Sequence, residues 1–196
     1  MYTRVAAFLS IALLTFALTG CPEPKFPDTP FITFKGIRAE PRPNKDSLII
    51  TITFRDGYGD LGLGPYDTLA PFDAEPFRYN YHITAYKRLG RTDQGEVNYE
   101  LVQFPTAGIT FNGRFPILKP DGQPGPIEGD LDYSIPIEFP QDLTNERYIL
   151  PGDTLQFKIF IYDRGEQDAA RNGNAPRNPN KSNEITTGEV VVLLPR

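Results

Sequence analysis

Hydrophobic and polar residues alternate with a period of two along two segments of the chain. In residues 48–54 the even-numbered positions are apolar, and in residues 155–161 the odd-numbered positions are. The two apolar faces consist of Leu48, Ile50, Ile52 and Phe54, and of Leu155, Phe157, Ile159 and Ile161. Because successive side chains of a strand point to opposite faces, this pattern predicts antiparallel strands with one buried face.

Further segments rich in aromatic and β-branched residues have the same strand character. The expected strands are residues 31–37, 47–55, 77–89, 96–104, 108–118, 131–139, 154–162 and 183–194. Twenty prolines and 17 glycines supply turn residues between them. The sequence therefore predicts an all-β domain over residues 31–196, an immunoglobulin-like antiparallel β-sandwich of about 7–8 strands. A closed β-barrel is the alternative.

Two connections between expected strands are long, namely residues 56–76 and residues 163–182. Loops longer than about 12–15 residues are uncommon in compact domains, and those that occur are usually functional or disordered. In an immunoglobulin-like strand order these two connections open at the same end of the sandwich. We therefore expect them to lie side by side.

The N-terminus has the features of a secretion signal. Arg4 precedes an apolar run over residues 5–18, which is shorter than the roughly 20 residues of a membrane span, an uncleaved N-terminal membrane helix being the alternative. Residues 18–21, Leu-Thr-Gly-Cys, resemble the bacterial lipobox, in which the cysteine is alkylated by a lipid donor. The resemblance implies a signal peptide over residues 1–20 and lipidation of Cys21. Residues 21–30 would form a proline-rich tether.

Lipidation implies a location and a set of partners. We expect a lipoprotein of the outer membrane, held by its lipid on the periplasmic face or at the cell surface. The formal net charge of −5 and the lack of a basic cluster argue against nucleic acid as a partner. An envelope protein or a glycan fits better. Cys21 is the only cysteine, so the domain has no internal disulfide.

The beginning of the first long connection resembles a phrase found in a group of proteins. Residues 54–62 read FRDGYGDLG, similar to the F-x-D-G-D-G-D-L-G phrase of secreted lipoproteins from Bacteroidetes-type bacteria. Residues 163–165 and 181–184 match the outer parts of a later phrase of that group, D-R-x-G-N-x-S-N. The resemblance supports the expected location and fold more than any activity.

Three aspartates in these phrases are candidate metal ligands. Asp56 continues the apolar phase of residues 48–54 and Asp163 continues that of residues 155–161, so both lie where a core face ends. With Asp60 they would either bind loop amides and Arg164, or hold a calcium ion through carboxylate oxygens. Tyr58 occupies the place of a middle acidic ligand, and the lack of flanking helices excludes an EF-hand.

Other residues with catalytic chemistry fit structural roles better. Strand parity places Tyr81 and Ile83 toward the core, so His82, the only histidine, is expected at the surface. A zinc site with two histidines is excluded, and a Ser-His-Asp triad lacks a nucleophile context. Asp130 and Asp132 are expected at a strand start, where acids form turn bonds, although a carboxylate pair can serve a glycosidase.

The long connections carry residues suited to a binding rim. These candidates are Tyr58, Tyr66, Phe72, Arg164 and Arg171. The sequence favours a non-catalytic binding or assembly module of the envelope over an acidic-residue hydrolase or a structural spacer. Because the first strand leads away from the tether and the second returns, the two long connections are expected on the membrane-proximal side.

Overall fold

The computed structural model describes residues 25–42, 45–104, 109–119, 125–138, 149–165 and 178–193. Within these ranges the chain forms strands and turns and no helix. The strands are β1 (Phe31–Arg42), β2 (Lys45–Asp56), β3 (Tyr81–Arg91), β4 (Val97–Leu101), β5 (Ile127–Glu138), β6 (Thr154–Ile161), β7 (Ile185–Thr186) and β8 (Val190–Val191). The expected signal peptide, Cys21 and Arg171 lie outside the described residues. No helix in the described ranges is long and apolar enough to span a membrane.

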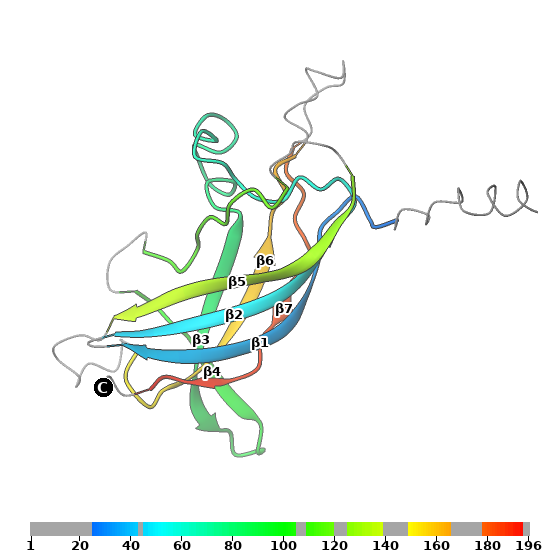
Figure 1. Cartoon of the computed structure of the whole chain (residues 1–196). Coiled ribbons are helices and arrows are strands. Elements are labelled where there is room, and N and C mark those ends of the chain that lie inside the picture. The colour runs from blue at the N-terminus through cyan, green and yellow to red at the C-terminus, as the bar shows by residue number, and fades with distance from the viewer. Residues whose placement is uncertain are drawn as a thin grey trace, which may run out of the picture.

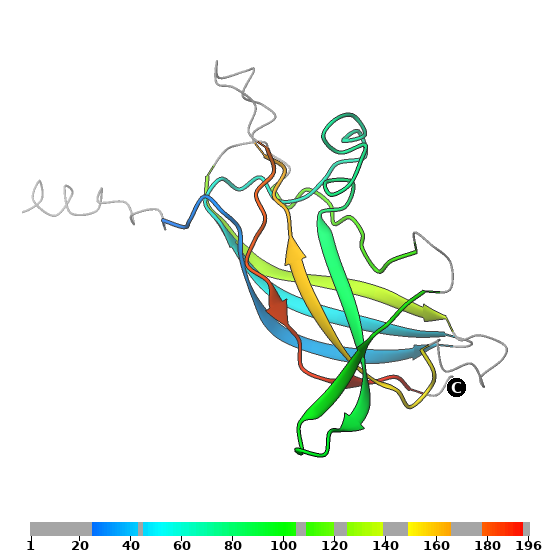
Figure 2. The same ribbon diagram turned by 180° about the vertical axis from the view of Figure 1, so that it is seen from behind.

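The strands form two antiparallel sheets that face each other. One sheet has the order β1-β2-β5, and the other has the order β4-β3-β6-β7, with β8 also paired to β6. The two sheets lie in separate layers and do not close into a barrel (Figures 1 and 2). The all-β sandwich is therefore confirmed, and the barrel alternative is wrong. The partition of β1, β2 and β5 from β3 and β6 is the one expected of an immunoglobulin-like sandwich.

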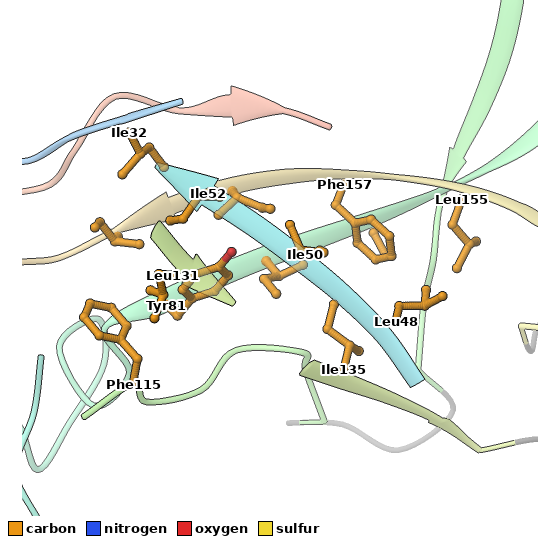
Figure 3. Close-up of a cluster of buried hydrophobic side chains, with 14 of the residues drawn as sticks. Ile32, Leu48, Ile50, Ile52, Tyr81, Phe115, Leu131, Ile135, Leu155 and Phe157 are labelled. Atoms are coloured by element: carbon orange, nitrogen blue, oxygen red, sulfur yellow. The ribbon is translucent and has the colours of Figure 1, made fainter. Parts of the chain in front are cut away.

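The core lies between the sheets and is built from the two predicted apolar faces. Every residue of those faces is buried, from Leu48 to Phe54 on β2 and from Leu155 to Ile161 on β6. Figure 3 shows several of these side chains pointing toward one another across the sandwich. Tyr81 of β3 joins them and stacks on Tyr133 of β5, with ring centroids 4.2 Å apart.

Two of the expected segments do not form single strands as predicted. Residues 108–118 were expected to form a strand, but the described part, 109–119, forms only one bridge, between Gly113 and Tyr81. Pro116 lacks the N–H that a sheet ladder requires, and the segment instead inserts Phe115 into the end of the core. In the described part of residues 183–194 there are two short strands, β7 and β8, separated by residues 187–189.

His82 is buried, contrary to the prediction that it lies at the surface. It does point away from the core, but residues 76–80 and neighbouring aromatic rings cover it, leaving 8% of the residue exposed. Its ring stacks on Phe160, and its Nε2–H donates to the carbonyls of Pro76 (3.0 Å) and Tyr79 (2.9 Å). Parity gave the correct face, but a loop covers that face.

The two long connections leave the sandwich at the same end, as predicted. The end of β2 pairs with the start of β1, and the end of β6 pairs with the start of β3. The chain preceding β1 lies at this end too, because Gly57 N–H donates to the carbonyl of Pro27 over 2.9 Å. Figure 1 shows the first strand, the loop after β2 and the segment after β6 meeting there. We call this the loop end.

Candidate functional site

Three aspartates meet at the loop end. Asp56 is the last residue of β2, Asp60 follows in the turn, and Asp163 lies two residues beyond the end of β6. Backbone contacts hold these segments together, because Leu61 bridges to Asp163 and Arg164 N–H donates to the Asp60 carbonyl over 3.0 Å. One carboxylate oxygen from each aspartate lies within 4.8 Å of the others. The predicted convergence of Asp56, Asp60 and Asp163 is thus present.

The Asp56 carboxylate organises the turn that follows β2. The residue is fully buried, and its Oδ2 accepts hydrogen bonds from the backbone N–H groups of Gly59 (2.7 Å) and Asp60 (3.0 Å). Gly59 has a φ of +73°, and a Cβ there would lie 2.1 Å from the Gly125 carbonyl oxygen. The turn therefore requires glycine. The second oxygen of Asp56, Oδ1, is buried and has no hydrogen-bond partner.

The electrostatic environment of Asp56 disfavours its charged form. The pKa of Asp56 is raised to about 7, mainly by burial and then by repulsion from Asp60 and, less, from Asp163. The amides of Asp60 and Gly59 act in the opposite direction, since they stabilise the carboxylate, but they do not compensate fully. A proton or a cation at this point would relieve the repulsion.

Asp163 closes the base of the second long connection. Its Oδ1 accepts from the backbone N–H groups of Gly165 (3.0 Å) and Asn180 (2.6 Å), and its Oδ2 accepts from Asn180 Nδ2 (3.0 Å). The residue is 1% exposed. Loop amides therefore hold both Asp163 and Asp56, which was the first of the two interpretations made from the sequence. That interpretation leaves Asp56 Oδ1 unexplained.

We call residues 57–80 the loop platform. The side chains of Arg114 and Asn80 join this segment to residues 114–115, and the sequence did not predict this role for them. The guanidinium of Arg114 donates to the carbonyls of Arg78 (2.6 Å), Asp67 (3.0 Å) and Phe72 (3.0 Å). The Asn80 side chain bonds to both the N–H and the carbonyl of Phe115. The misassigned strand 108–118 hid this role, because Arg114 reads there as an ordinary outward-facing residue.

The predicted binding rim is present only in part. Tyr66 of the platform is 93% exposed, whereas Phe72 is 4% exposed, so the assignment of Phe72 to the rim was wrong. The backbone carbonyl of this buried residue accepts one of the three hydrogen bonds from Arg114. Tyr58 is partly exposed and its hydroxyl donates to Asp28 (3.2 Å), and Arg164 is half-buried. Leu69, 78% exposed beside Tyr66, was not predicted.

Asp130 and Asp132 lie on the solvent face of β5, and each pairs with other side chains. They are inside the strand rather than at its start, and their partners are on β2 and β1 rather than in a turn. Asp130 pairs with Lys35 and Thr53, and Asp132 pairs with Arg38 and Thr51. These hydrogen bonds lower the pKa of both carboxyls. The prediction of turn bonds was wrong because β5 begins earlier than expected.

A cavity of about 530 Å³ opens away from the aspartates, between β5 and residues 102–112. Its described walls are mostly apolar and include Phe104, Phe111, Ile135 and Ile149, with no Asp, Glu, Lys, Arg or His among them. The polar atoms of this lining belong to uncharged side chains, among them Tyr133, Asn112 and Ser134. The charged groups gathered at the loop end are of greater chemical interest.

Comparisons of this chain with protein-family models, with curated proteins and with solved structures find no match. Its function is therefore argued from its own residues.

Proposed function

We propose that this chain is a lipid-anchored, non-catalytic binding or assembly module of the bacterial envelope. Cys21 would hold it on the outer membrane, and the loop platform would contact an envelope protein or a glycan. The observation that carries the proposal is a long, irregular loop that is rigidly built and yet presents large apolar side chains to solvent. Tyr66 and Leu69 of this loop are 93% and 78% exposed.

The platform is ordered well beyond its contacts with Arg114. Asp67 closes a turn by accepting from Gly64 N–H (2.7 Å), and Phe72 N–H donates to the Leu69 carbonyl (2.8 Å). A surface ordered before binding loses little conformational entropy when a partner docks. Burying one large apolar side chain contributes about 1.5–3 kcal/mol. Rigid exposed Tyr66 and Leu69 are therefore suited to anchor a partner.

The position of the tether supports a partner close to the membrane. Residues 25–30 meet the loop end, where Pro27 accepts from Gly57 and Asp28 accepts from the Tyr58 hydroxyl. A lipid on Cys21 would keep this end nearer to the bilayer than the opposite, hairpin end formed by β3 and β4. This agrees with the orientation expected from the sequence and favours a membrane-embedded or membrane-apposed partner.

The anchor is tested by Cys21→Ala in the bacterium that makes the chain. Metabolic labelling with a fatty acid should mark the wild-type chain and leave the variant unlabelled, because the thiol is the site of lipid attachment. After membrane fractionation we expect the variant in the soluble fraction and the wild-type chain in the membrane fraction. An unlabelled wild-type chain, or a variant labelled to the same extent, would contradict the anchor.

The binding role is tested by a photo-crosslinking residue placed at position 66, with position 89 as the control. Leu89 is also apolar and 55% exposed, but it lies on β3 in the hairpin that pairs with β4. We expect a discrete adduct from position 66 that is lost when Leu69→Ser is added, and no such adduct from position 89. Equal crosslinking from both positions, or none from position 66, would favour a spacer over a binding module.

A further inference from the structure

We propose that Asp56, Asp60 and Asp163 form a calcium site that joins the two sheets of the sandwich at the loop end. The inference concerns the stability of the domain and is independent of the partner proposed for the loop platform. It rests on the orphaned oxygen of Asp56, on the spacing of the three carboxylates and on the strands that carry them.

One oxygen of the Asp56 carboxylate is buried and has no hydrogen-bond partner. Asp56 is fully buried, and its Oδ1 has no hydrogen-bond partner although Oδ2 receives two amides. Buried polar atoms in folded proteins are nearly always paired, because leaving one unpaired costs about 1–3 kcal/mol and more for a charged group. A cation bound beside this oxygen would supply the missing partner and would offset the repulsion among the three carboxylates.

The distances between the carboxylate oxygens of the three aspartates suit a calcium ion. One oxygen from each aspartate lies within 4.8 Å of the others. Calcium–oxygen bonds of about 2.3–2.6 Å allow two ligands of the same ion to be up to about 5 Å apart. The spacing of the three oxygens is therefore within the range that ligands of a single calcium ion can have.

The chemical type of the three ligands favours calcium over other metal ions. The cluster offers oxygen and neither nitrogen nor sulfur, which disfavours zinc. Calcium accepts six to eight oxygens in irregular arrangements, including carbonyls and water, whereas magnesium demands a near-ideal octahedron. Ligands drawn from a turn, a strand end and a loop base suit the more tolerant ion.

The ligands come from both sheets, so a bound ion would join the sheets. Asp56 ends β2 of the first sheet, and Asp163 follows β6 of the second sheet. An ion bound by both would connect the sheets where their apolar faces run out. The chain has no pair of cysteines that could make such a connection by a disulfide. Asp60 stands where the loop platform begins, so the same ion would also fix the base of the platform.

Thermal unfolding of the full chain in mild detergent tests the proposal. After chelation, calcium at about 5 mM should raise the unfolding midpoint by about 3–9 °C, as expected for a site with the affinity of extracellular calcium modules. Asp56→Asn and Asp60→Asn should each abolish the rise. Asp60→Asn keeps the test informative if Asp56→Asn fails to fold, because Asp60 is only partly buried.

Asp130→Asn is the matched control, since it removes a carboxylate from the exposed face of β5 and should leave the rise intact. A wild-type chain that does not respond to calcium would overturn the proposal. So would an undiminished response in Asp60→Asn. An equal rise with magnesium at the same concentration would overturn the assignment to calcium.

Discussion

Two groups of aspartates in this protein have the same side chain and opposite surroundings. Asp130 and Asp132 lie on the open face of β5, where hydrogen bonds and cations lower the pKa of each carboxyl. Asp56 lies at the end of the neighbouring strand β2, where burial and the nearby Asp60 raise its pKa to about 7. The pKa values differ because the side chains of Asp130 and Asp132 face solvent, whereas the side chain of Asp56 is buried at the end of the core.

The comparison teaches where this fold tolerates change. The acids on β5 have partners that water could replace, so their ion pairs contribute little to stability. The acids at the loop end organise backbone that has no other acceptor, and they repel one another while doing so. We therefore expect small effects on the open face of β5 and large effects at the loop end.

The pH dependence of the calcium-free chain should show the largest effect. Asp56 has a pKa of 3.8 in an unperturbed chain and about 7 in the folded one. Between about pH 4 and pH 7 only the unfolded state loses this proton, so the free energy of unfolding falls as the pH rises, by at most about 4 kcal/mol. Urea unfolding over this window measures the fall.

Asp56→Asn is the control for this pH dependence, because its amide does not titrate. The difference in unfolding free energy between the wild-type chain and Asp56→Asn should change across the window and level off above about pH 7. A difference that stays constant from pH 4 to pH 8 would show that the Asp56 pKa is not raised.

Gly59→Ala should destabilise the chain by about 3 kcal/mol, because positive φ strain adds to a steric clash. The new Cβ would lie 2.1 Å from the Gly125 carbonyl oxygen. Gly95 has a similar φ of +83° but nothing within 4 Å of its would-be Cβ, so Gly95→Ala should cost only about 1 kcal/mol. Chemical denaturation of both variants measures the contribution of the contact. Equal costs would mean that the Asp56 turn does not pack against residue 125.

Asp163→Ala should destabilise the chain by about 2–3 kcal/mol, since it removes the acceptor of three hydrogen bonds at the base of the second connection. Asp163→Asn retains one side-chain oxygen for the two backbone N–H groups and should cost less. Hydrogen exchange at the Gly165 and Asn180 amides, compared between the variants, reports on the same bonds. Unchanged exchange in Asp163→Ala would argue against this role for Asp163.

Asp130→Asn should have the smallest effect, a shift of the urea midpoint close to the error of measurement at pH 7. The lowered pKa means that the ionised form contributes stability above the pKa of the unfolded chain and loses it as the pH falls below that value. The wild-type chain and the variant should therefore converge at low pH. A large loss of stability at pH 7 would remove the contrast between the two groups of aspartates.

The sequence predicted the centre of the fold and the convergence of the acids for one reason, the alternation on β2 and β6. That alternation gave the core faces, and its continuation gave the positions of Asp56 and Asp163. Features set by loops could not be found in this way. His82 lies on the face that parity predicted, but it is covered by a segment whose path depends on contacts with Arg114 and Asn80. Periodicity carries no information about such distant contacts.

The burial of Phe72 was missed for the same reason. An aromatic residue in a long polar loop is equally compatible with a rim and with a small local core. The hydrogen bonds from Arg114 to three carbonyls of this loop join residues far apart in the sequence, and no local pattern predicts them. The orphaned Oδ1 of Asp56 likewise depends on which oxygen the loop amides reach.

A crystal structure of the chain grown with calcium tests the central claim most directly. The account predicts an anomalous peak at the loop end, with carboxylate oxygens of Asp56, Asp60 and Asp163 about 2.3–2.6 Å away and Asp56 Oδ1 among the ligands. A loop end with no peak at saturating calcium, and with Asp56 hydrogen-bonded through a proton to a neighbouring carboxylate, would contradict it.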